Sequence, residues 1–148
     1  MNYASYIMFV LISFVLKILP RKISLFIGRL IGRFLYYVVP IRKKVAKKNI
    51  NFIFKNLSIK ERKKILKDTY IHYGMVLVDF MRISSNNVKS INKLFSIDDE
   101  SKKILDKNRG SIMVTGHFGN WEYFAPFLSL NNFKFCIIAQ VIKNKFLN

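Results

Sequence analysis

Cysteine is nearly absent from this sequence, because Cys136 is the only one in 148 residues. A single thiol excludes an intramolecular disulfide and a metal site built from several thiolates, and it suits a reducing compartment. Cys136 lies in the apolar stretch 135–139, which is typical of a buried core thiol. No metal and no cofactor is therefore expected from the cysteine content or from any other motif.

Acidic residues are also scarce, with eight Asp and Glu against 26 Lys and Arg, and the formal net charge is +18. Such a charge repels itself and calls for an anionic partner, either a nucleic acid or an anionic membrane. Residues 1–67 hold 16 of the basic residues and one acidic residue, and they also contain the longest apolar stretches. Basic residues among long aliphatic faces favour a lipid interface, and no specific nucleic acid is expected.

The N-terminus has no Lys or Arg before Lys17, although Tyr6–Leu16 is a dense apolar run. A secretory signal peptide needs a basic start and a small-residue cleavage site, and both are missing here. The run is slightly shorter than the roughly 20 residues of a membrane span. Because all basic residues follow it, the rest of the chain is expected in the cytoplasm. We expect residues 1–20 to form an uncleaved membrane anchor, spanning or half-embedded, and residues 21–148 to form a separate domain.

Between residues 23 and 38, apolar residues recur at helical spacing. Arg29 and Arg33 lie four residues apart on the opposite face, which predicts an interfacial helix whose arginines reach lipid phosphates. Gly28 and Gly32 form a small-xxx-small pair, a pattern that often marks close helix packing.

A strongly basic amphipathic stretch begins at Ile41. A run of charge is usually a solvated helix face, but next to two membrane-seeking segments it favours anionic lipid. We expect Arg42, Lys43 and Lys44 to contact lipid phosphates.

The second half of the chain predicts an α/β fold. Ser58 and Glu61 form a capping box that begins a helix reaching about Ile83, where the turn-forming residues 84–87 end it. Further on, the pattern indicates a helix over 99–105, a strand over 111–115, a loop over 116–121, a helix over 122–129 and a strand over 133–141. Strand, loop, helix and strand form a βαβ unit, whose sheet would be parallel.

The most informative segment is Thr115–Glu122, at the expected carboxyl end of the first strand, where active residues of open α/β sheets are usually placed. His117 could act as a base, and Glu122, near the first turn of the next helix, could hold its other ring nitrogen. Gly116 and Gly119 permit close approach of a substrate. Other interpretations stay open on local grounds: Asn120 could cap the helix, the helix dipole could favour Glu122, and Trp121 could be core.

The octet closely resembles the His-x4-Glu block of the bacterial lipid A biosynthesis acyltransferases, the lauroyl/myristoyl transferase family. The usual form of that block is Gly-His-Phe-Gly-Asn-Trp-Glu, which is residues 116–122 here. The resemblance implies a glycerolipid-acyltransferase-like βαβ sheet domain, of which this chain would be an N-terminal, truncated fragment. The chain departs from the family in having Gln140 where an Arg is common, and in lacking a proline near Lys143.

The resemblance also implies an activity. A fatty acyl group would pass from acyl carrier protein to a hydroxyl of a lipid A precursor, at the cytoplasmic face of the bacterial inner membrane. His117 would be the general base and Glu122 would orient it, while Gly116, Phe118, Gly119, Asn120 and Trp121 would bind substrate. The alternatives are a non-catalytic membrane-associated remnant, and an acyltransferase for another glycolipid or a glycerolipid.

Overall fold

A computed structural model of the chain describes residues 3–83, 88–107 and 112–138. The described residues are mostly helical and form two compact units; the first ends at Arg82 and the second begins at Ile83. The first unit holds the four longest helices, α1 (Tyr3–Ile18), α2 (Arg21–Tyr37), α3 (Lys43–Ile53) and α4 (Ile59–Arg82). The second holds α5 (Val88–Asn92), α6 (Asp99–Lys107), the 3-10 helix η2 (Trp121–Tyr123) and α7 (Phe124–Leu130).

The predicted α/β fold is wrong, because the described part of the chain contains no strand or sheet. Residues 112–115 and 133–138, where strands were expected, have no regular structure. A strand is completed by hydrogen bonds to a neighbouring strand, and these two segments form no ladder with each other. Their aliphatic side chains are uncovered, with Ile112 92% and Val114 89% exposed, whereas Phe133 and Phe135 pack half-buried against the core of the second unit. Ser111, residues 139–141, the expected turn 84–87, Gln140 and Lys143 lie outside the described residues.

The spanning form of the anchor expected over residues 1–20 is also wrong, whereas its half-embedded form stays a prediction. None of the described helices combines the length and the apolar character that a membrane crossing requires. Helix α1 has 16 residues and rises about 24 Å, whereas a bilayer's hydrocarbon core is about 30 Å thick. The division of the chain into residues 1–20 and 21–148 stays a prediction.

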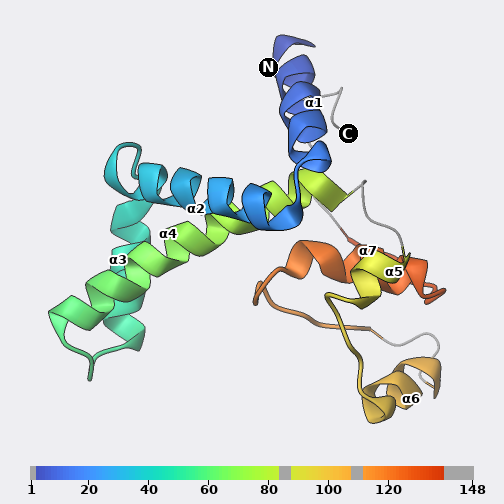
Figure 1. Ribbon diagram of the computed structural model, residues 1–148. Helices are drawn as coiled ribbons and strands as arrows, with labels where there is room; N and C mark the ends of the chain where they lie inside the picture. The colour runs from blue at the N-terminus through green and yellow to red at the C-terminus, as the bar shows by residue number, and fades with distance from the viewer. Residues whose placement is uncertain (1–2, 84–87, 108–111, 139–148) are drawn as a thin grey trace. The chain divides into compact units, whose positions relative to one another are not determined.

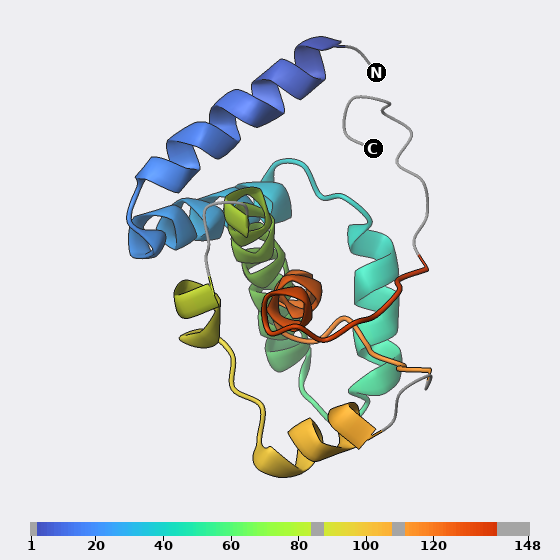
Figure 2. The same cartoon turned by 90° about the vertical axis from the view of Figure 1, so that its right-hand side faces the viewer.

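Glycine brings the backbones of α2 and α4 into contact where the two helices cross (Figures 1 and 2). On α2, Ser24, Gly28 and Gly32 recur every fourth residue and are buried. Gly74 of α4 lies opposite them, and a Cβ built on it would be 2.7 Å from the amide nitrogen of Gly32. The prediction that Gly28 and Gly32 mark close helix packing is confirmed.

Buried polar side chains join the C-terminal end of α4 to the bend between α1 and α2. Arg82 donates hydrogen bonds to the carbonyl of Leu19 (2.7 Å) and to the hydroxyl of Ser24 (2.9 Å). One turn earlier, the Asp79 carboxylate accepts two hydrogen bonds from Arg21, the shorter at 2.5 Å. Asp79 is 2% exposed, so this pair fixes the start of α2 against α4.

The predicted helix over residues 58–83 is confirmed as α4, and its capping box forms as expected. The Glu61 carboxylate accepts hydrogen bonds from the Ser58 amide (2.8 Å) and hydroxyl (2.7 Å), and the Ser58 hydroxyl accepts one from the Glu61 amide. These bonds from Ser58 lower the pKa of Glu61 below its usual value of 4.5. The helix therefore begins at Ile59 with its first turn satisfied.

The second unit has a small aromatic core of its own. Ile91 from α5 packs with Tyr123, Phe127 and Leu128 from η2 and α7, and all four are buried. Phe95 stacks against the Tyr123 ring, with the two centroids 6.0 Å apart. This core holds η2 and α7 in place.

Candidate functional site

The predicted catalytic block, residues 116–122, runs from an extended segment into η2. Its last residue, Glu122, directly precedes Tyr123, which is 1% exposed in the core of the second unit. Tyr123 also donates its backbone N–H to the carbonyl of Asn120, at 3.3 Å. The end of the block is therefore fixed by the core, while its beginning reaches solvent.

His117 is exposed and lies against the ring of Trp121, with the centroids 4.8 Å apart and the planes at 59°. Glu122 is half-buried in η2. The structure brings His117 together with Trp121, and within the described part of the chain His117 forms no hydrogen bond or ion pair with Glu122. The orienting contact that was predicted for Glu122 is thus not made in this conformation.

The two glycines of the block differ in what they do. Gly119 has a φ of +55°, a backbone angle that side-chain-bearing residues rarely adopt, so the turn before η2 depends on glycine. Gly116 lies under the Phe118 ring, and a Cβ built on it would be 2.7 Å from that ring. The Phe118 amide also donates to the Gly116 carbonyl at 2.9 Å. The result is a tight bend that leaves His117 and Phe118 exposed, Phe118 by 85%.

Asn120 and Trp121 are both half-buried at the start of η2. Asn120 stands at the cap position of η2, but its side chain makes no capping hydrogen bond. The Trp121 ring is the one that contacts His117. Of the five predicted substrate-binding residues, Phe118 and Gly119 are exposed, whereas Gly116, Asn120 and Trp121 are half-buried.

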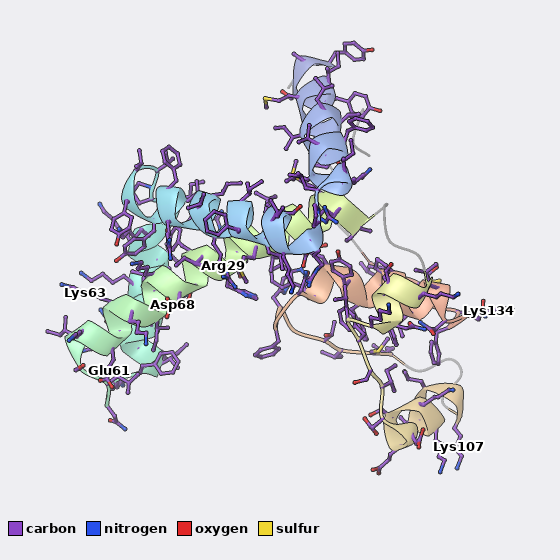
Figure 3. The ribbon with its side chains drawn as sticks, viewed as in Figure 1. Arg29, Glu61, Lys63, Asp68, Lys107 and Lys134 are labelled. Atoms are coloured by element: carbon purple, nitrogen blue, oxygen red, sulfur yellow. The ribbon has the colours of Figure 1, made fainter. Side chains whose placement is uncertain are left out.

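The predicted lipid-contacting residues lie in the first unit and fall into two groups. Arg29, Arg33, Arg42 and Lys44 are exposed, and Arg29 reaches from α2 to α4 (Figure 3), where its Nε donates a 3.3 Å hydrogen bond to the Met75 sulfur. Lys43 instead turns inward: it donates a 2.8 Å hydrogen bond to the Tyr36 carbonyl, and its Nζ lies 3.8 Å from the centre of the Tyr36 ring. Lys43 thus holds the connection between α2 and α3.

The family of bacterial lipid A biosynthesis acyltransferases matches the chain over residues 1–148. The chain belongs to this family. Two curated relatives are each 28% identical to it over 106 residues: a lipid A biosynthesis palmitoleoyltransferase of Escherichia coli (strain K12) and a lipid A biosynthesis acyltransferase of Shigella flexneri. The matched part is 70% of this chain but 35% of each relative, so the chain spans about a third of their length. No solved structure matches it.

Membership of this acyltransferase family confirms the resemblance that residues 116–122 indicated. Sequence reasoning missed two features of the site. One is Tyr123, which anchors the block and could have been suspected as the aromatic residue next to Glu122. The other is the tilted contact between the His117 and Trp121 rings, for which the four-residue spacing gave no specific signal. The described residues contain no group of three His, Cys, Asp or Glu side chains that could bind a metal ion.

Proposed function

We propose that this chain takes part in the transfer of a fatty acyl group from acyl carrier protein to a hydroxyl of a lipid A precursor. The observation that carries the proposal is the block at residues 116–122, with an exposed histidine and a following glutamate, in a member of this family. The donor and acceptor are inferred from the family, and both are anionic, as suits a chain of charge +18.

In the proposed reaction His117 is the general base. Its neutral imidazole takes the proton of the sugar hydroxyl as the oxygen attacks the thioester carbonyl of the acyl donor. The tetrahedral intermediate then collapses, the carbon–sulfur bond breaks, and the imidazolium returns the proton to the departing thiolate. A sugar hydroxyl is a poor nucleophile without such a base, which typically accelerates the reaction by about 10²–10⁴-fold.

Glu122 would act by orienting His117 and stabilising the imidazolium. The present geometry sets a condition on this role, because the His117 ring packs on Trp121 and does not bond Glu122. Catalytic hydrogen bonds are often long or poorly aligned before substrate binds and tighten only in the reacting complex. The proposal therefore includes a rotation of His117 off the Trp121 ring, toward Glu122, when the acceptor enters.

The proposal also places the first unit on an anionic bilayer surface, the cytoplasmic face of the inner membrane. Support comes from the exposed apolar side of α2, where Ile23, Phe26, Leu30 and Phe34 are 45–55% exposed at helical spacing. Arg29 and Arg33 lie on the same helix and are exposed as well. Exposed apolar side chains beside arginines suit a helix that lies in the plane of the membrane and pairs with lipid phosphates.

Acyl transfer by the chain tests the catalytic proposal. With a radiolabelled acyl donor on acyl carrier protein and a lipid A precursor in detergent micelles, His117→Ala should lower turnover by about 10²–10⁴-fold. Glu122→Gln should lower it less, because hydrogen bonding is retained while the charge is lost. The matched control is His72→Ala, which removes the chain's other histidine, on α4 in the first unit, and should leave turnover unchanged.

Two results would contradict the proposal. Near-normal turnover in His117→Ala would make the block a structural element only. No acyl transfer by the unaltered chain would favour the alternative function, a membrane-associated protein without catalysis.

A further inference from the structure

A hollow of about 750 Å³ lies in the first unit, between the C-terminal end of α2 and the beginning of α4. Tyr36 forms one wall, Ser58 and Glu61 lie at the start of α4, and the remaining lining is basic. The basic residues are Lys60, Lys63, Lys64 and Lys67. Figure 3 shows Glu61 and Lys63 at this end of α4. None of the four lysines belongs to the residues predicted to contact lipid.

The four lysines carry charge that the described residues do not neutralise. Lys60, Lys64 and Lys67 follow helical spacing and so share one side of α4. Among the described residues, no carboxylate pairs with Lys60, Lys63 or Lys64. Glu61, the acidic residue of the lining, is already held by the hydroxyl and amide of Ser58. Like charges at this spacing destabilise a helix, so an anion in the hollow would relieve their repulsion.

The aromatic wall of the hollow is held in place. The Tyr36 ring contacts the edges of two others, with its centroid 4.8 Å from that of Tyr37 and 5.7 Å from that of Tyr70. Lys67 lies over the Tyr37 ring at 5.5 Å. These contacts fix the Tyr36 ring and place the Lys67 ammonium beside the neighbouring Tyr37 ring.

An apolar rim adjoins the hollow. Tyr37, Val38, Val39 and Ile41 follow directly from α2 and are 65%, 61%, 45% and 61% exposed. The hydroxyl of Tyr70 on α4 donates to the Ile41 carbonyl, which ties this rim to α4. A cationic hollow beside an apolar rim matches a ligand with an anionic head and a hydrocarbon tail. An acidic protein surface would be attracted by the charge of the hollow, but its charged groups would make no use of the apolar rim.

We propose that this hollow binds the phosphate-bearing headgroup of a membrane lipid, with the acyl chains of that lipid lying along residues 37–41. The proposal rests on the membrane docking given under Proposed function and adds to it a site for one headgroup. Lysines suit this ligand because their ammonium groups are mobile point charges, which can surround a phosphate without a fixed geometry.

Vesicle co-sedimentation tests the proposal. The probe is a phosphatidylcholine vesicle that contains phosphatidic acid, and the variant is Lys63→Gln, Lys64→Gln, Lys67→Gln. Each lysine near an anionic surface contributes about fivefold to binding, so the triple variant should bind about a hundredfold more weakly. The matched control is Lys102→Gln, Lys103→Gln, Lys107→Gln, which removes the same charge from exposed positions on α6 and should lose far less. Far-UV circular dichroism checks that both triple variants keep their helices.

The possible outcomes distinguish this proposal from the alternative explanations. If the unaltered chain does not bind the vesicles, the membrane docking itself fails. If it binds and the two triple variants lose affinity equally, the attraction is general and the hollow is no site. Displacement from the vesicles by soluble glycerol 3-phosphate would indicate a site for free phosphate esters. If the triple variant at the hollow keeps its affinity for vesicles but loses binding to acyl carrier protein, the ligand of the hollow is an acidic protein and not a lipid.

Discussion

Replacing Gly74 by alanine adds one methyl group where α4 crosses α2. The added Cβ would meet the carbonyl oxygen of Gly28, and would be 2.7 Å from the Gly32 nitrogen and 2.9 Å from the Gly32 Cα. Ordinary contact begins near 3.4 Å, so α2 would have to move away by about 0.7 Å at the nitrogen alone. All these atoms belong to the backbone of a helix and cannot rotate aside as a side chain can.

Two effects of opposite sign determine how far Gly74→Ala changes the stability of the first unit. Forcing an extra carbon into a well-packed contact costs about 1–3 kcal/mol, and backbone neighbours place this site near the upper end. Alanine recovers about 1 kcal/mol, because it is a better helix former than glycine. We therefore expect Gly74→Ala to lower the free energy of unfolding of the first unit by about 2 kcal/mol.

Urea unfolding followed by far-UV circular dichroism measures this change. The control is Asn51→Ala, at an exposed position of α3, where helix propensity acts without a packing cost and stability should stay the same or rise slightly. If Gly74→Ala is as stable as the unaltered chain, or more so, the contact between the α2 and α4 backbones does not hold the unit together.

Two further predictions concern the membrane surface and pH. Phe26→Ser combined with Phe34→Ser should weaken binding to anionic vesicles at high salt, where charge attraction is screened and apolar burial is not. The comparison is Phe52→Ser, at an aromatic position on α3 that is even more exposed (73% against 55% and 54%), and equal losses would contradict an α2-specific contact. The Glu61 carboxylate has a lowered pKa in the folded chain, so its contribution to stability is present above the usual value of 4.5 and is lost as pH falls through the lowered value. The free energies of unfolding of Glu61→Gln and of the unaltered chain, measured with urea, should therefore converge in acid. A difference between them that stays constant across that pH range would refute the role of the charge.

Local signals predicted the helices well. The capping residues Ser58 and Glu61 act within one turn, and α4 begins where they indicate. The pair Gly28 and Gly32 predicted a close helix contact, but it could not name Gly74, which is far away in the sequence. Contacts of this kind depend on how two helices meet, and the pattern of one helix does not contain that information.

The prediction of two strands was wrong for a related reason. Ile112 and Val114 have the β-branched side chains that strands favour, yet their backbone lies in an irregular segment. Sequence preference describes a single segment, whereas a strand exists only in a pair. The site was affected in the same way: the block at 116–122 was recognised from its residues, but the packing of His117 on Trp121 is a matter of side-chain rotamers.

The hydrogen bond from Arg82 to the Leu19 carbonyl also governs the order in which the first unit can fold on the ribosome. Its two residues are 63 positions apart. At roughly 5–20 residues per second, Arg82 is added about 3–13 seconds after Leu19. During that interval the bend after α1 has no partner from α4, and Gly28 and Gly32 face no second helix. The nascent chain must keep two apolar helices from aggregating until Arg82 emerges and bonds to the bend between α1 and α2.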